Sequence, residues 1–134
     1  MGKTGIKILL ACSLFVLSVF YGNILTGRGL NPDAVVGVWL TKKQDSKIQI
    51  LKSRDGTFYG RIIWAEEPYE QFTGMEVMRG VTYDARENKY ECPWIYSPRL
   101  KMSARAVLFL EGDVLEVKVI KGIISVREEF TRVK

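Results

Sequence analysis

The chain has 134 residues, which is enough for one domain of ordinary size. It carries 20 basic and 15 acidic residues, a formal net charge of +5, no histidine and two cysteines. Without histidine, Ser-His-acid and Cys-His catalytic arrangements and the commonest zinc and copper ligand sets are excluded. Nucleic-acid binding also has no support, because the sequence holds no compact basic patch with interleaved aromatic residues.

Residues 1–30 differ in composition from the rest of the chain. Lys3 and Lys7 precede a continuous apolar run over residues 8–21, a pattern typical of a secretory signal peptide. The run is shorter than the roughly 20 residues of a membrane span. Because Ile24 and its neighbour extend it and no A-x-A cleavage site follows, an uncleaved N-terminal anchor is the alternative. We therefore expect export to the periplasm or cell envelope, with membrane contact only through this segment if it is retained.

The remaining residues, 31–134, form the expected domain. Removing the three basic residues of the leader leaves 17 basic and 15 acidic residues, so the domain is close to neutral. Only Cys92 lies in it. In an oxidising compartment a lone cysteine is either buried and inert or a route to a disulfide-linked dimer. We favour the buried form, since a free cysteine often behaves as a small hydrophobe.

The domain has the pattern of successive short strands separated by turn residues such as Asp55-Gly56 and Gly112. The first strand contains Gly37-Val38-Trp39, where the glycine permits close approach of a neighbouring group. No segment shows a helical period. Sequential strands with short turns predict an all-β, antiparallel up-and-down barrel of about eight strands, because closure protects the sheet edges. The expected strands are 35–41, 47–52, 57–64, 77–83, 89–96, 101–110, 114–120 and 123–133.

The aromatic residues of these strands are expected to line the barrel. A barrel of about eight strands is either filled by side chains or leaves room for one small ligand. Strict alternation places Trp64 on one face with Phe58, Gly60 and Ile62. Core packing is the default for each aromatic side chain. The candidate ligand contacts at the interior or the mouth are Trp64, Tyr83, Trp94, Tyr96, Phe109 and Phe130.

Two groups of carboxylates deserve separate hypotheses. The acidic segment 65–76 is the longest irregular stretch, and we interpret it as a connection, a lid or a source of an acid–base pair. On the last strand, Glu128 is in phase with Phe130 and so is expected to face inward. An interior carboxylate needs a partner, for which Arg61 and Arg105 are the candidates. Glu128 is then either a ligand contact or half of a structural ion pair.

Four short motifs occur in order along the domain: Gly37-Val38-Trp39, residues 60–64 (GRIIW), residues 95–98 (IYSP) and residues 130–132 (FTR). Over about residues 35–134 the chain resembles the bacterial exported family catalogued as domain of unknown function 2147. The resemblance implies a small lipocalin-like or fatty-acid-binding-like barrel. It also implies that the strand of Gly37 and Trp39 closes one end of the barrel and that Arg132, on the last strand, lies across Trp39 in a structural cation–π contact. Ser97 stands where members usually carry aspartate.

Taken together, these observations predict a non-catalytic barrel that needs no cofactor or metal and holds a small apolar ligand in the cell envelope. The alternative is a structural or interaction protein with a filled barrel, acting through its outer surface or through residues 65–76. An enzyme is the third hypothesis, and it would depend on carboxylate, tyrosine and lysine side chains alone.

Overall fold

The structure is a computed structural model that describes residues 31–134. The predictions for residues 1–30 lie outside the described residues. Residues Pro32–Lys134 form one compact unit. Within this part of the chain, no helix is long and apolar enough to cross a membrane. The unit opens with a short 3-10 helix, η1 (Pro32–Val35), at the place where the first strand was expected to begin.

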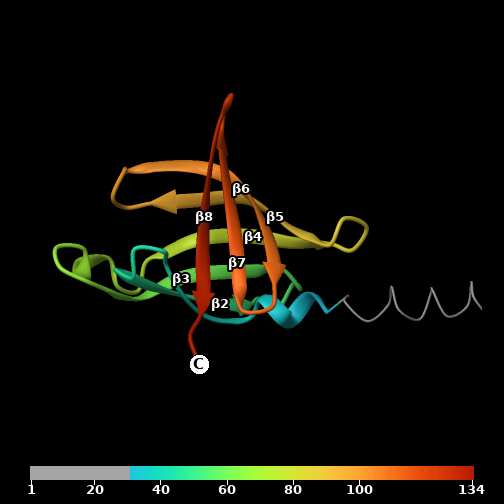
Figure 1. The fold of residues 1–134 in the computed structure, drawn as a ribbon, viewed down its shortest axis with the longest axis horizontal. Coiled ribbons are helices and arrows are strands. Elements are labelled where there is room, and N and C mark those ends of the chain that lie inside the picture. Colours follow the sequence, from blue (N-terminus) through green and yellow to red (C-terminus); the bar gives the residue numbers. More distant parts are fainter. Residues whose placement is uncertain (1–30) are drawn as a thin grey trace, which may run out of the picture. The chain divides into compact units, whose positions relative to one another are not determined.

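Eight antiparallel strands follow and close into a barrel, each pairing with its neighbour in sequence and β1 pairing with β8 (Figure 1). This confirms the predicted all-β up-and-down barrel. A second 3-10 helix, η2 (Glu70–Phe72), lies in the long connection between the third and fourth strands. The strands are β1 (Gly37–Leu40), β2 (Ser46–Lys52), β3 (Phe58–Ala65), β4 (Glu76–Asp84), β5 (Lys89–Ser97), β6 (Met102–Glu111), β7 (Val114–Lys121) and β8 (Ile124–Arg132).

Apolar side chains from all eight strands and from η1 form a single buried cluster. No polar or charged residue is buried among the described residues, and no buried side-chain polar atom of this region lacks a hydrogen-bond partner. Every member of the cluster lies between Val35 and Phe130. The unit therefore contains its own hydrophobic core, and we expect it to fold without residues 1–31.

Trp39 is the largest fully buried side chain of this core. Its indole nitrogen donates a hydrogen bond to the backbone oxygen of Val35, at 3.0 Å. Arg132 pairs with Trp39 across β1 and β8, and its guanidinium lies 4.4 Å from the indole centroid. The structural cation–π contact implied by the family resemblance is therefore present.

Arg132 also closes the end of the barrel that η1 covers. Its two terminal nitrogens donate to the backbone oxygens of Val36, at 3.1 Å, and Ala34, at 2.6 Å. Its Nε lies 3.3 Å from the Asp113 carboxylate. Gly37 has a φ of +152°, and a Cβ atom there would stand 2.6 Å from Nη1 of Arg132. The glycine thus gives this guanidinium room to reach η1, as expected for a close approach.

A β-bulge in β3 changes which side chains face the core. Lys47 pairs with Trp64 and Ile48 with Ile62, so Ile63 is the extra residue. Strict alternation fails from this point, and Ile63 and Trp64 are both exposed. The expectation that Trp64 shares the inner face with Phe58 is therefore wrong.

A second bulge interrupts β5 at Pro93, as a proline inside a strand suggests. Cys92 pairs with Ala106 and Ile95 with Ala104, so two residues of β5 oppose one of β6. The phase is reversed beyond the bulge. Ile95 packs against the core, and Trp94 is placed opposite the exposed Arg79 on β4.

The hairpin of β7 and β8 extends beyond the rest of the barrel (Figure 1). The two strands pair along their whole length, from Val114–Thr131 to Lys121–Ile124. β1, by contrast, reaches only Arg132 and Thr131 of β8. Among the described residues, positions 124–130 of β8 therefore have no strand on their outer edge. The free edge and the hairpin turn are available for contact with other molecules.

Candidate functional site

The barrel interior is filled by side chains. The core cluster contains 17 buried residues, which include Trp39, Phe58 and Phe130. The two most pronounced hollows of the described part of the chain are lined largely by exposed or half-buried residues of the outer surface. Neither provides the enclosed apolar chamber that an interior ligand would occupy.

The six aromatic candidates do not form one site. Phe130 is buried in the core, and Tyr83 packs against it while its hydroxyl donates to Asn88, at 2.7 Å. Trp64 is 41% exposed and Phe109 is 38% exposed, so neither lies in the barrel interior, which was the first of the two positions predicted for them. Phe109 lies on the outer side of β6 because its neighbours Leu108 and Leu110 face the core.

Trp94 and Tyr96 stack on each other on the half-buried side of β5, with ring centroids 6.0 Å apart and planes inclined by 6°. Arg79 lies 4.4 Å above the Trp94 ring. The bulge at Pro93 accounts for this placement, since it turns both rings away from the core side. These aromatic residues stabilise the outer surface of the sheet by cation–π and stacking contacts.

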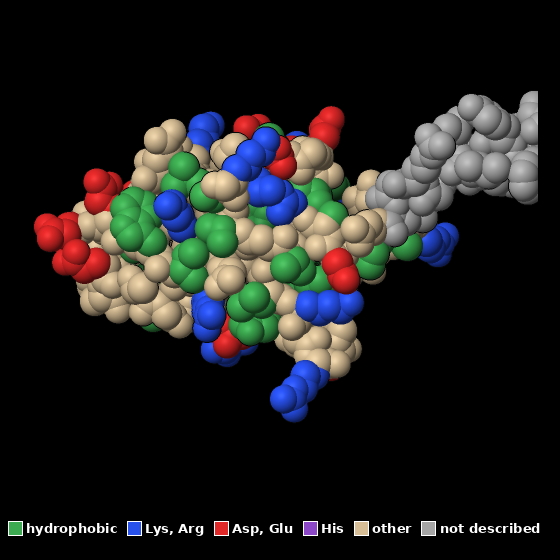
Figure 2. Space-filling model, turned by 90° about the horizontal axis from the view of Figure 1, so that it is seen from below, with side chains coloured by type: hydrophobic (Ala, Val, Ile, Leu, Met, Phe, Trp, Pro, Cys, Tyr) green, Lys and Arg blue, Asp and Glu red, His purple; other side chains and the backbone are tan. Residues whose placement is uncertain are grey.

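The acidic segment 65–76 is anchored to the barrel. Tyr69 and Phe72 stack with ring centroids 6.3 Å apart, and both pack against the core. The guanidinium of Arg99, from the turn between β5 and β6, lies 5.0 Å from the Tyr69 ring and contacts Asp45. Acidic side chains of the segment are exposed at this end of the molecule (Figure 2). The arrangement ties three connections together and leaves the carboxylates in solvent.

Arg99 and Asp45 influence each other's titration. Hydrogen bonding and the charge of Asp45 raise the pKa of Arg99, with smaller contributions from Tyr69 and Glu128. Burial opposes ionisation of Asp45, but hydrogen bonds from Thr41 and Arg99 outweigh it and lower the pKa of its carboxyl group. The pair therefore remains ionised at neutral pH and joins the turn before β2 to the turn before β6.

Glu128 does not face the core, contrary to the prediction. It is exposed on the part of β8 that extends beyond the barrel. Its electrostatic neighbour is Arg99, rather than Arg61 or Arg105. The alternation of β8 is intact, but no opposite wall of the barrel covers this face. A carboxylate here needs no buried partner.

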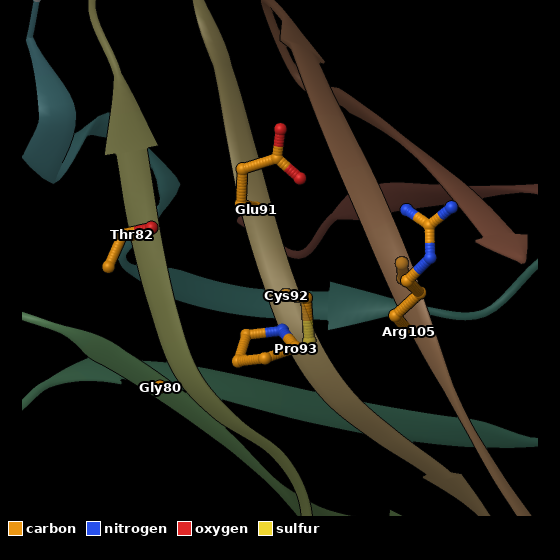
Figure 3. A pocket seen from close by; sticks show the side chains of 7 residues that line it. Gly80, Thr82, Glu91, Cys92, Pro93 and Arg105 are labelled. Carbon is orange, nitrogen blue, oxygen red and sulfur yellow. The ribbon is translucent and has the colours of Figure 1, made fainter.

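The clearest hollow lies on the outside of β4, β5 and β6 (Figure 3) and has a volume of about 420 Å³. It forms where the bulge at Pro93 and Gly80 separates the strands. Glu91 and Arg105 stand at its rim on neighbouring strands. The groove is open and offers polar contacts, without a nucleophile–base pair. Its lining residues are Gly80, Thr82, Glu91, Cys92, Pro93, Arg105 and Ala106.

Cys92 is a free, buried thiol, as predicted. Its sulfur donates a hydrogen bond to the backbone oxygen of Trp94, at 3.1 Å. Burial raises the pKa of the thiol to about 11, from an ordinary value of 9.0. The thiolate that nucleophilic chemistry requires is therefore scarce at neutral pH.

The raised pKa of Cys92 predicts a loss of stability in alkali. Between pH 9 and 11 the thiol ionises in the unfolded chain while it stays protonated in the folded one, so rising pH favours unfolding. Urea unfolding across this range should show the free energy falling by roughly 1–3 kcal/mol more in the wild type than in Cys92→Ala. Equal pH slopes for the two proteins would contradict the assignment.

The surface feature that the strand pattern did not identify is the extended β7–β8 hairpin. Its exposed apolar residues are Ile123, Ile124 and Val126. The sequence did contain an indication of this hairpin. The first expected strand is shorter than the last, so part of the last strand must extend beyond the strand that pairs with it. Comparison with known proteins does not bear on this feature: no family model, no curated protein and no solved structure matches the chain. The resemblance to domain of unknown function 2147 stays a prediction.

Proposed function

We propose that the barrel is a non-catalytic interaction module of the cell envelope that acts through its outer surface. The observation that carries the proposal is the filled interior, in which Trp39, Phe58 and Phe130 occupy the space a ligand would need. An apolar guest would have to displace these buried side chains, and close-packed protein interiors resist such insertion.

The distribution of apolar surface adds support. Buried and unsatisfied polar groups often mark a binding cavity, and none is found within residues 31–134. Large apolar side chains do stand in solvent on the β7–β8 hairpin, among them Ile123, Ile124 and Val126. Exposed apolar groups gathered on one part of a soluble domain are typical of an interaction surface.

A tryptophan titration tests the proposal. The chain has three tryptophans, so the double variant Trp64→Phe, Trp94→Phe keeps buried Trp39 as the sole reporter. We expect the emission of Trp39 to stay unchanged when fatty acids or an apolar dye are added. The matched variant Trp39→Phe, Trp94→Phe keeps the exposed Trp64 and reports any binding at the surface. A saturable change of the Trp39 emission would contradict a filled interior.

A further inference from the structure

Two neighbouring hairpins carry most of the exposed apolar surface of the domain. On the β7–β8 hairpin, the side chains of Ile123, Ile124 and Val126 are 104%, 67% and 54% exposed. Leu100 and Met102 are exposed at the β5–β6 turn. Five of the nine large apolar residues exposed among residues 31–134 thus lie at or near the turns of these two hairpins. Exposed apolar side chains gathered at projecting turns are typical of a surface that contacts an apolar partner.

The turns of these two hairpins, with the strand residues next to them, are basic, whereas the strands farther from the turns carry Glu91, Glu111, Glu116, Glu128 and Glu129. Residues 97–107 and 117–127 contain six of the 17 basic residues of the domain and none of its 15 acidic ones. The rest of the domain is therefore net negative. A hydrogen bond from Lys121 Nζ to the backbone oxygen of Ser103, at 2.6 Å, joins the two hairpins. The charges near this hydrogen bond act together as one patch, because charges closer than a Debye length are not fully screened from each other by salt.

Most of this charge is available to an external anion. Within the described residues, Lys101, Arg105 and Lys118 have no ion-pair partner. Arg127 contacts Glu116 at 3.1 Å, but its side chain is 65% exposed, so this pair is weak. Arg99 is held in an ion pair with Asp45, so its charge is less available to an external anion.

We propose that the β7–β8 turn docks onto a bilayer that carries anionic phospholipid headgroups. The proposal rests on the outer-surface function above and names its partner. Ile123 and Ile124 enter the interfacial zone, and Lys118, Lys121 and Arg105 meet the phosphates. Only the turn inserts, because the unpaired backbone groups of β8 would be costly to bury in hydrocarbon.

Vesicle sedimentation of residues 32–134, free of the apolar leader, tests the proposal. The probes are vesicles of phosphatidylcholine alone and of equal parts phosphatidylcholine and phosphatidylglycerol. We expect binding to the anionic vesicles only, weakening as salt is added. Lys118→Ala with Lys121→Ala should weaken it by about 30-fold, because each basic residue near an anionic surface contributes about fivefold. Ile123→Ser with Ile124→Ser should weaken it by about tenfold or more.

Ile63→Ser is the matched control, because Ile63 is an exposed isoleucine on β3 and lies outside the two hairpins. It should bind like the wild type. Equal binding to both kinds of vesicle, or wild-type affinity in the Ile123→Ser, Ile124→Ser variant, would overturn the membrane proposal. So would a dimer in vesicle-free solution that this variant dissociates, since a second copy would then cover the turn. The Trp39 titration tests the filled interior and does not depend on vesicle binding. The membrane proposal can therefore fail while the proposed outer-surface function stands.

Discussion

Trp39→Ala should lower the free energy of unfolding of the domain by about 3–5 kcal/mol, the usual cost of truncating a large buried aromatic side chain. The indole is fully buried, hydrogen-bonded to Val35 and covered by Arg132. Its removal leaves a cavity at the end of the barrel that η1 and β8 close. Equilibrium urea unfolding, followed by circular dichroism, measures the change.

Trp64→Ala provides the matched comparison, because the same side chain is removed from an exposed position after the β3 bulge. It should cost about 1 kcal/mol or less, including its cation–π contact with Lys47. Equal losses for the two substitutions would contradict the outward placement of Trp64.

Arg132→Ala should lower the free energy of unfolding by about 2–4 kcal/mol. The substitution removes two charge-assisted hydrogen bonds to backbone oxygens of η1 and the cation–π contact with Trp39. The same urea experiment applies. A loss below about 1 kcal/mol would show that the guanidinium adds little beyond the packing of its neighbours.

Gly37→Ala separates the role of Arg132 from backbone strain. In the wild type, the added Cβ would lie 2.6 Å from Nη1 and force the guanidinium away from the backbone of η1. In the Arg132→Ala background only the cost of a positive φ should remain. A double-mutant cycle should therefore show the two substitutions to be strongly non-additive. Additive losses would mean that Gly37 is required for its conformation alone.

The barrel itself could be predicted because every strand carries a local signature. Turn residues such as Asp55-Gly56 and Gly112 separate alternating runs, and their order allows only a meander that closes. The pairing of Arg132 with Trp39 was available from the family resemblance. The strand signatures are short-range patterns, which the sequence carries directly, whereas the contact between Arg132 and Trp39 joins the two ends of the domain.

The placement of the aromatic candidates could not be predicted from alternation. One extra residue at Ile63 in β3 and another at Pro93 in β5 reverse the inward and outward alternation of the side chains that follow in each strand. Trp64, Trp94 and Tyr96 therefore leave the interior, although their spacing would place them inside. Proline signals the second bulge, whereas nothing in the run of apolar residues around Ile63 signals the first.

The exposure of Glu128 depends on strand length rather than phase. Its inner-face alternation with Phe130 was predicted, but this part of β8 projects beyond the rest of the barrel, so no wall lies opposite its inner face (Figure 1). Whether an inward phase is buried depends on the opposite wall, which only the three-dimensional pairing determines. The same mismatch leaves the β7–β8 hairpin exposed, and the proposed membrane contact depends on it.

Native mass spectrometry of residues 32–134, exported to the periplasm and purified without detergent, tests the central claim most directly. If the interior is filled and the barrel acts through its outer surface, the spectrum shows the mass of the polypeptide alone. A discrete additional mass would contradict it if it is retained in the native state, released on denaturation, still present in the Ile123→Ser, Ile124→Ser variant and able to change the emission of Trp39 in the Trp64→Phe, Trp94→Phe variant. Such a ligand would occupy the barrel interior.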